Sequence, residues 1–376
     1  MIGAGQLARM SVAPAQALGV GLRILAVSPD ESAAQVARDV WLGRHDDLDA
    51  VLAAAEGVDV VTFDHEHVPP PILQALLDRG VAVRPGPAAL AHAQDKATLR
   101  AALADINVPQ PQWAVVSDIA DVTAFAERAG WPVVLKMSRG GYDGRGVWVL
   151  DSTSAVADLM ATVDLAAPAV WLAEEFVRFD QELSAQVARS PHGQAVAYPV
   201  VRTVQKDGIC VEVIAPAPGL TAGESATAQE LALRIAGAFD VTGMLAVELF
   251  HTDDGRILVN ELAMRPHNSG HWSIDGAMTS QFENHLRAVL DLPLGDPRPV
   301  APHVVMVNVL GGEHPDLYAA FKHIMARDPG ARVHLYGKQV RPGRKVGHVT
   351  VLGRDLDQLL ERARHAAGYL TGTITE

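Results

Sequence analysis

The chain of 376 residues contains one cysteine and no long hydrophobic run, and it has fewer basic than acidic residues. Cys210 therefore has no partner for an intrachain disulfide, and a reducing cytoplasm is expected. No apolar run approaches the roughly 18 residues of a membrane helix, and the first residues lack a signal-peptide layout. With 31 basic and 44 acidic residues, the net charge is −13. That charge argues against a general nucleic-acid binder, because phosphate backbones need a cationic face, and the lack of a membrane helix predicts a soluble protein.

The length exceeds what one hydrophobic core usually fills, so two or three domains are expected. Short apolar runs at 22–27, 58–63 and 81–83 alternate with helix-like stretches. This alternation predicts a doubly wound, Rossmann-like α/β domain over residues 1–92. The turn at Gly3–Ala8 is typical of a strand leading into a helix, yet almost nothing precedes it. We therefore expect the first strand to be missing.

The middle of the chain predicts a mixed α/β and α+β region. A helix over 94–103 leads to strands at 113–116 and 133–136 with a helix between them, which indicates a small lid over about 113–173. Polar and apolar residues alternate in 182–187, so one face of that strand is expected to be buried and the other wet. A long helix is expected over 223–239.

The end of the chain predicts a small separate unit. Four prolines between 291 and 302 indicate a linker. Strands near 303–309 and 346–352 and a helix over 356–368 follow. The expected domains are therefore 1–92, 93–292 and 303–376.

Two strongly apolar strands, 244–250 and 257–262, flank a turn-forming segment at 253–256. A two-residue turn at Asp254-Gly255, or a four-residue loop, would place Glu248 directly opposite Glu261. Opposed like charges destabilise a sheet, and burying either charge unpaired costs several kcal/mol. A bound Mg²⁺ or a shared proton would resolve this, and Asn260 offers another oxygen to the metal. The alternatives are that each glutamate pairs with its own lysine or arginine, or that the strands are edge strands with both carboxylates in water.

A glycine-rich loop, 140–146 (GGYDGRG), follows a short apolar strand that ends at Lys136. Its backbone N–H groups could wrap around phosphate oxygens, and Lys136 and Arg145 favour an anionic ligand over a plain hairpin loop. A Walker loop is absent, and a strand rather than a helix follows. The segment 174–177, with Glu182, is typical of an adenine-binding connection, but its composition also fits an ordinary strand end.

Taken together, Lys136, the 140–146 loop, residues 174–177, Glu248 and Asn260-Glu261 resemble the ATP-grasp superfamily. Within it, three segments resemble the family of N5-carboxyaminoimidazole ribonucleotide synthetases of purine biosynthesis. They are 5–10 (GQLARM), 265–272 (RPHNSGHW) and 341–348 (RPGRKVGH). The resemblance covers essentially the whole chain. It implies an ATP-grasp fold with a Rossmann-like N-terminal domain and a small C-terminal unit.

The resemblance also implies the ligands and their residues. The substrates would be ATP, bicarbonate and 5-aminoimidazole ribonucleotide, with Mg²⁺ (or Mn²⁺) held by Glu248 and Glu261, in a homodimer. ATP would contact Lys96, Lys136, Gly141, Tyr142, Asp143, Gly144, Arg145, Gly146, Val147, Glu174, Glu175, Phe176, Val177, Glu182, Gln205, Asn260 and Glu261. The ribonucleotide would contact Tyr142, Asp143, Arg145, Asn268, Lys338, Arg344 and Lys345. Catalytic roles would fall to Lys136, Arg145, Arg265 and His271.

Two positions depart from the family pattern. Gln205 stands where a histidine is usual near ATP, and Asp64 replaces a usual glutamate. The Gln205 amide can still donate a hydrogen bond, whereas the Asp64 carboxylate is on a shorter side chain than that of glutamate and reaches less far. Cys210 is expected to pack within a strand, because the implied mechanism through carboxyphosphate needs no covalent enzyme intermediate.

Three other functions compete. Gly3, Gly5 and Ala8 fit a dinucleotide fingerprint, which would indicate an NAD-dependent oxidoreductase but would leave the carboxylate hairpin unexplained. A sister ATP-grasp ligase, such as the formate-dependent glycinamide ribonucleotide transformylase, would share the nucleotide site. A non-catalytic nucleotide-binding module would share it too.

Overall fold

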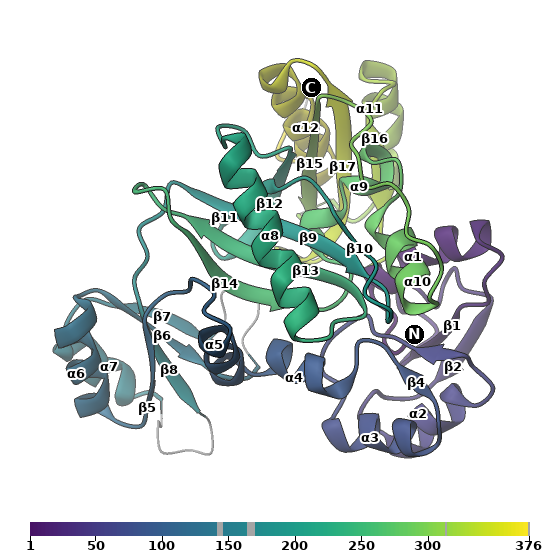
Figure 1. Cartoon of the computed structure of the whole chain (residues 1–376). Helices are drawn as coiled ribbons and strands as arrows, with labels where there is room; N and C mark the ends of the chain where they lie inside the picture. Colours follow the sequence, from purple (N-terminus) through teal and green to yellow (C-terminus); the bar gives the residue numbers. More distant parts are fainter. Residues whose placement is uncertain (141–145, 164–169, 313, 375–376) are drawn as a thin grey trace.

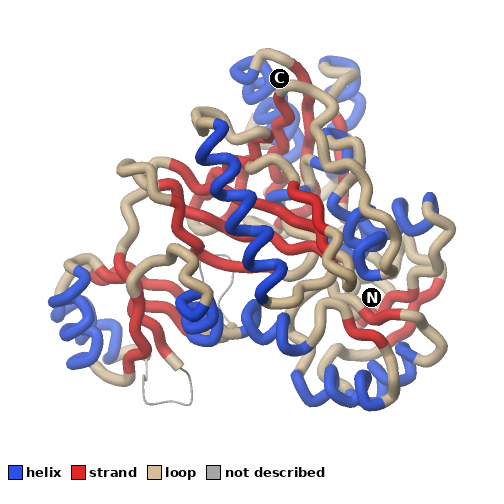
Figure 2. Tube along the Cα trace, in the orientation of Figure 1, coloured by secondary structure: helices blue, strands red, loops and turns tan. Residues whose placement is uncertain are grey.

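The computed structural model describes residues 1–140, 146–163, 170–312 and 314–374. Figure 1 shows the N-terminal segment and a small sheet domain on either side of a large sheet, with the C-terminal segment at its far end. Figure 2 shows helices and strands in every part of the chain, with consecutive strands β8 to β12 in the middle. The mixed architecture agrees with the predicted fold class.

The N-terminal segment is built on parallel strand pairs, β1 with β2 and β3 with β4. Ile2 bridges both Leu25 and Phe63 in parallel, so the first residues lie between the two pairs and join them. The parallel bridges of Ile2 therefore lie where the sequence analysis expected the first strand to be missing. The elements are α1 (Gln6–Ala17), β1 (Arg23–Ala26), β2 (Asp39–Leu42), α2 (Leu48–Ala55), β3 (Val60–Val61), α3 (Pro70–Asp78), β4 (Ala82–Val83) and α4 (Pro87–Gln94).

The lid is a four-stranded antiparallel sheet in the order β5-β8-β6-β7. Two helices cover it, and its apolar core, which includes Val122, Phe125 and Leu135, is separate from the other cores. The predicted strands and helix of this region are confirmed. The elements are α5 (Lys96–Asp105), β5 (Trp113–Val116), α6 (Ile119–Ala129), β6 (Val133–Met137), β7 (Val147–Leu150), α7 (Thr153–Met160) and β8 (Trp171–Glu175).

The large sheet has nine strands among the described residues, in the order β14-β13-β9-β11-β12-β15-β17-β16, with β10 paired to β9. The long helix α8 crosses one face (Figure 1), and its capping box of Thr221 and Glu224 fixes where it begins. The central elements are β9 (Gln181–Arg189), β10 (Ala195–Ala197), β11 (Val201–Lys206), β12 (Ile209–Ala215), α8 (Ala222–Ala238), β13 (Gly243–His251), β14 (Ile257–Ala263), η1 (Asn268–Gly270), α9 (Ser273–Gly276) and α10 (Gln281–Val289).

The C-terminal strands continue the large sheet, because β15 pairs with β12 as well as with β17. Helix α12 packs on this end and shares a core with Val305, Val349 and Leu359. The predicted strands and final helix are confirmed. The elements are β15 (His303–Leu310), η2 (Leu317–Ala320), α11 (Phe321–Arg327), β16 (Arg332–Leu335), β17 (Lys345–Gly353) and α12 (Leu356–Thr371).

The prediction of a wet face on 182–187 is wrong for most of that strand. Residues 183–188 of β9 are all buried. Helix α8 packs against β9, while Ser184 Oγ and Gln186 Nε2 meet Ser269 Oγ of η1 at 2.8 and 3.0 Å. The alternating polar residues therefore face other protein groups, and only Glu182, at the start of the strand, reaches the cavity described next.

Candidate active site

A cavity of about 770 Å³ lies between the lid sheet and the β9-β13-β14 end of the large sheet. Many residues predicted to bind ATP line it: Lys96, Lys136, Val147, Glu174, Glu175, Phe176, Val177, Glu182, Gln205, Asn260 and Glu261. Glu248, Arg265, His267, Asn268 and Lys345 line it as well. Residues from widely separated stretches of sequence therefore share one cavity.

The two carboxylates on the hairpin are directly paired, as predicted, but not through the predicted turn. Glu248 of β13 pairs with Glu261 of β14, while His251 pairs with Ile257. The loop thus spans five residues, 252–256, and an odd loop alone would have set Glu248 against Asn260. A bulge beyond Glu248 shifts the register by one residue and restores the Glu248–Glu261 pair.

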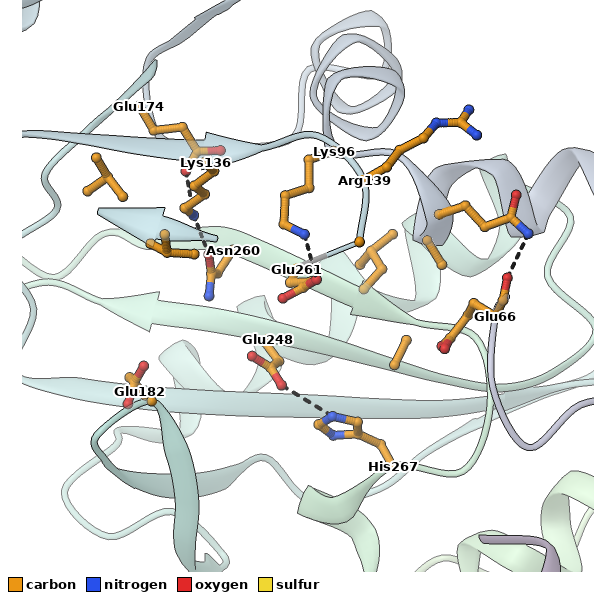
Figure 3. A pocket seen from close by; sticks show the side chains of 18 of the residues that line it. Glu66, Lys96, Lys136, Arg139, Glu174, Glu182, Glu248, Asn260, Glu261 and His267 are labelled. Carbon is orange, nitrogen blue, oxygen red and sulfur yellow. Dashed lines mark hydrogen bonds and ion pairs between the residues drawn. The ribbon is translucent and has the colours of Figure 1, made fainter. Parts of the chain in front are cut away.

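The bulge also changes which side chains share a face. Consecutive residues of a regular strand point to opposite faces, yet Asn260 and Glu261 both line the cavity. Figure 3 shows both side chains directed into the same space, with Glu248 on the neighbouring strand. The irregular register therefore brings an amide oxygen to two opposed carboxylates.

The electrostatics of Glu248 reflect this crowding. Burial, together with the charge of Glu261, raises the pKa of Glu248 to about 8. Its Oε1 lies 3.3 Å from His267 Nε2, and burial with the nearby Arg265 charge lowers the pKa of His267 to about 3. A neutral imidazole offers no full counter-charge to the Glu248 carboxylate.

Lys136, at the end of β6, is held by a buried carboxylate. Its Nζ lies 2.7 Å from Glu174 Oε2 and 3.4 Å from Asn260 Oδ1 (Figure 3). Glu174 also accepts a 2.8 Å bond from Arg100 Nε. Burial alone would raise the pKa of Glu174, but the charges of Lys136 and Arg100 bring it down to about 2. Glu174 is thus an ionised anchor for Lys136.

Arg100 is a site residue that the sequence reasoning missed. It is 1 % exposed and lies on α5, four residues after Lys96. Residues four apart share a helix face, so the prediction that Lys96 faces the site should have drawn attention to Arg100. Lys96 itself lies at the N-terminus of α5, and its Nζ is 3.4 Å from Glu261 Oε1.

A second ion pair closes the end of the cavity nearest the N-terminal segment. Arg265 Nε lies 2.8 Å from Glu66 Oε2, and Glu66 is a further residue that the sequence reasoning did not assign. Both line the cavity. Burial raises the pKa of Glu182, at the opposite end, to about 7.

His271 does not line the cavity, so its predicted catalytic role is not supported. The imidazole is completely buried, its Nδ1 meets Gln281 Nε2 at 3.1 Å, and its ring packs near His348 and Phe282. It belongs to the interior that supports η1. His267, four residues earlier, reaches the cavity instead.

The three basic residues of the C-terminal region that were predicted to bind the ribonucleotide lie in different surroundings. Lys345 lines the cavity. Lys338 is largely buried and donates to Gln6 Oε1 of α1, with its ammonium 5.8 Å from the centre of the Tyr336 ring. Arg344 is exposed and donates to the Gln339 carbonyl at 3.3 Å. Lys338 and Arg344 therefore lie beside the cavity and do not line it.

The dinucleotide interpretation of the N-terminal turn conflicts with the structure. Asp64, a buried residue, accepts hydrogen bonds from the backbone N–H groups of Gly5 and Ala8 at the start of α1. A dinucleotide pyrophosphate needs that same helix N-terminus. The carboxylate therefore occupies the place where the anion would bind.

Comparison with known proteins decides the family. The ATP-grasp domain matches residues 101–282, a ribonucleotide synthetase preATP-grasp domain matches 1–94, and the phosphoribosylaminoimidazole carboxylase C-terminal domain matches 304–362. The N5-carboxyaminoimidazole ribonucleotide synthase of Mycobacterium tuberculosis H37Rv is 54% identical over 99% of this chain and 87% of its own length. That of Corynebacterium ammoniagenes is 46% identical over 98% and 91%.

The chain belongs to the N5-carboxyaminoimidazole ribonucleotide synthase family. As a member of that family it is an ATP-dependent ligase. The synthetase structure from Thermus thermophilus matches with a TM-score of 0.88 at 37% identity, covering 100% of both chains. The synthase of Aspergillus clavatus, in complex with ADP and 5-aminoimidazole ribonucleotide, matches with a TM-score of 0.89 at 30% identity, covering 99% and 98%.

The glycine loop of this synthase family member is only partly described. The predicted contacts Gly141, Tyr142, Asp143, Gly144 and Arg145 lie outside the described residues. Gly146, which follows them, has φ +73°, a conformation that favours glycine. The roles predicted for the loop therefore stay predictions.

The residues present fit a magnesium ion. Among the described residues no group of three His, Cys, Asp or Glu side chains could hold a metal. A Mg²⁺ site does not need three such side chains, because Mg²⁺ is commonly held by one or two carboxylates together with substrate phosphates and water. The pair of Glu248 and Glu261, with the Asn260 oxygen beside it, matches that donor set.

Among the described residues, no helix combines the length and apolar character needed to span a membrane.

Proposed function

We propose that this chain carboxylates 5-aminoimidazole ribonucleotide with bicarbonate, converting ATP to ADP and phosphate, in purine biosynthesis. The observation that carries the proposal is the shared cavity in which Lys136, held by Glu174, faces the Glu248–Glu261 pair across a space of about 770 Å³. Cations on one side and opposed carboxylates on the other suit a metal-bound triphosphate. Family membership supplies the acceptor substrate.

The nucleotide would lie with its phosphates between the lid and the hairpin. Lys136 and Lys96 provide positive charge for the phosphates, and the 174–177 segment lies at the adenine end. Glu182 is placed to accept hydrogen bonds from the ribose hydroxyls. Glu248 and Glu261, with the oxygen of Asn260, would hold Mg²⁺, which neutralises phosphate charge when bound.

In the first step a bicarbonate oxygen attacks the γ-phosphorus. A new P–O bond forms, the bond to the β-phosphate oxygen breaks, and ADP leaves with that electron pair. Phosphoryl transfer of this kind depends mainly on positioning and on charge stabilisation, which the lysines supply. The product, carboxyphosphate, is unstable in water, so a lid over the cavity protects it.

In the second step carboxyphosphate breaks its C–O bond and yields phosphate and CO₂. The exocyclic amine of the ribonucleotide attacks the carbon, a C–N bond forms, and the nitrogen loses a proton. Arg265, His267 and Asn268 lie where they can orient the one-carbon unit. No step uses Cys210, whose Sγ lies 3.6 Å from the Glu212 carbonyl.

The ribonucleotide would bind toward the N-terminal and C-terminal segments. We propose that Lys345, Lys338 and Arg344 contact its 5′-phosphate, because a phosphomonoester can accept several charge-assisted hydrogen bonds. Lys338 already bridges the C-terminal region to Gln6 of α1. Tyr142, Asp143 and Arg145 of the lid would contact the same substrate.

A homodimer in the cytoplasm completes the proposal. The family resemblance implies the dimer, and the single cysteine fits a reducing compartment. Light scattering after gel filtration would measure the oligomeric state, and a monomer at working concentration would contradict it.

The decisive experiment measures ADP release while each substrate is omitted in turn, with direct detection of the carboxylated ribonucleotide. ADP release should require the ribonucleotide and bicarbonate together. Release supported by formate and glycinamide ribonucleotide would instead identify the transformylase alternative. Saturable NADH binding without stabilisation by Mg-ATP would favour an oxidoreductase, and Mg-ATP stabilisation without turnover would favour a binding module.

A further inference from the structure

Among the described residues, strand β14 lies at the edge of the large sheet, and its outward backbone groups have no neighbouring strand there. At the bulge these groups are bonded by residues outside the sheet. Arg100 Nη1 donates to the Val259 carbonyl at 2.8 Å, and Nη2 donates to the Asn260 carbonyl at 2.9 Å. The Val259 N–H donates to the Pro109 carbonyl at 2.9 Å. One guanidinium therefore satisfies two successive carbonyls at the register shift.

The same guanidinium holds the anchor of the phosphate-facing lysine. Its Nε is 2.8 Å from Glu174 Oε1, and the other Glu174 oxygen is 2.7 Å from Lys136 Nζ. The side chains of Arg100 and Glu174 are each 2% exposed. A buried arginine with three directed bonds has little freedom to move, because loss of any one bond leaves a desolvated group unpaired.

Arg100 thus connects two parts of the cavity that belong to different sheets. Glu174 and Lys136 are on lid strands β8 and β6, whereas Asn260 and Glu261 are on β14. Arg100 does not line the cavity itself. Its geometry matters because the planar guanidinium presents its donors in a fixed fork, which the single ammonium of lysine cannot reproduce.

We propose that Arg100 is a positioning residue for the ATP and metal side of the reaction. It holds the β14 bulge in register, so that Asn260 and Glu261 face the cavity together, and it fixes Glu174 so that Lys136 points at the phosphates. It does not touch the substrates. This inference rests on the proposed function, because it assigns Lys136, Asn260 and Glu261 to the nucleotide and its metal.

The test compares Arg100→Lys and Arg100→Ala with the wild type in steady-state kinetics. For Arg100→Lys we expect the KM for ATP and the Mg²⁺ concentration at half-maximal rate each to rise at least tenfold. The KM for 5-aminoimidazole ribonucleotide should stay within about twofold. Added guanidinium should restore part of the activity of Arg100→Ala, because it can enter the vacated site.

Arg189→Lys is the matched control. Like Arg100, Arg189 bonds a carboxylate and the backbone, at Asp240 and the Val241 carbonyl, but neither of these partners lines the cavity. Lysine there should lower thermal stability without separating the two KM values. The inference is overturned if Arg100→Lys behaves like Arg189→Lys, or if the KM values for ATP and ribonucleotide rise equally.

Arg100→Ala could fail to fold, and the Arg100→Lys kinetics then decide alone. Different results would contradict the proposed function and the positioning role of Arg100. A wild-type protein that forms no carboxylated ribonucleotide contradicts the proposed function. A wild-type protein that forms it, with an Arg100→Lys variant of unchanged kinetics, contradicts only the positioning role.

Discussion

Glu248 lies directly opposite Glu261 across the β13–β14 ladder, and a bulge beyond Glu248 sets this register. Lys96 Nζ lies 3.4 Å from Glu261 Oε1, whereas burial and the charge of Glu261 raise the pKa of Glu248 to about 8. Like charges placed this closely destabilise a sheet unless a cation joins them. A divalent ion held between the two carboxylates, as we propose, would relieve this repulsion.

The first prediction concerns this pair. Glu261→Gln and Glu248→Gln should each lower kcat by about 10²- to 10³-fold, the range found when one charge-stabilising group is removed. The Mg²⁺ requirement should rise at the same time, and the unliganded variants should melt at or above the wild-type temperature. Kinetics at several Mg²⁺ concentrations, with calorimetry, measure these effects. Glu230→Gln, on the exposed face of α8, is the control. If the Glu248 and Glu261 variants had the same kcat as this control, the metal role would be contradicted.

The second prediction concerns Glu174 and stability. Glu174→Gln leaves Arg100 and Lys136 without their buried counter-charge, so the free energy of unfolding at pH 7 should fall by about 3 kcal/mol or more. The folded pKa of Glu174 is about 2, below its ordinary value of 4.5. The stabilisation it provides is therefore complete above pH 4.5 and is lost as the pH falls toward 2.

Urea unfolding of the wild type and Glu174→Gln across this range tests the sign. The difference between the two proteins should be constant at neutral pH and should shrink below pH 4.5. A difference that grows on acidification would contradict the ion-pair assignment.

The third prediction concerns Lys338 and the ribonucleotide. Burial, and then the charge of Arg344, lowers the pKa of Lys338 to about 8. In the proposed site only the protonated amine would bind the phosphate, so kcat/KM for the ribonucleotide should fall as the pH rises above 8. Lys338→Arg keeps its charge at high pH and should remove this inflection. The same inflection in both proteins would assign it to another group.

The fourth prediction concerns Arg344. Arg344→Ala removes a charge beside the proposed phosphate site and should raise the KM for the ribonucleotide about tenfold while changing the KM for ATP little. Arg332→Ala, an exposed arginine of β16, is the matched control. Equal increases in both KM values for Arg344→Ala would remove Arg344 from the ribonucleotide site.

The local pattern of the sequence was sufficient for most of the elements. Apolar runs and turn residues predicted the β13–β14 hairpin and the lid strands, because strand and turn preferences act over a few neighbouring residues. The family-specific strings at 140–146 and 265–272 indicated the activity. The prediction that Lys136, Glu174, Glu248 and Glu261 belong together also came from the sequence.

Tertiary structure decided which side chains reach the cavity. The alternation in 182–187 predicted a wet face, but η1 covers its polar residues Ser184 and Gln186, because burial depends on elements distant in sequence. His271 and His267 lie in the same string, yet only His267 lines the cavity. Sequence spacing alone cannot distinguish two histidines whose directions are set by the packing of η1.

The register of the hairpin also depends partly on the sequence and partly on the tertiary structure. The sequence determined that two apolar strands would each place a glutamate near the same level. Only the fold decided that a five-residue loop and a bulge, with Arg100 on the edge carbonyls, would align Glu248, Asn260 and Glu261. A bulge depends on hydrogen bonds made across the edge of a sheet, and those partners come from α5, which lies far earlier in the chain.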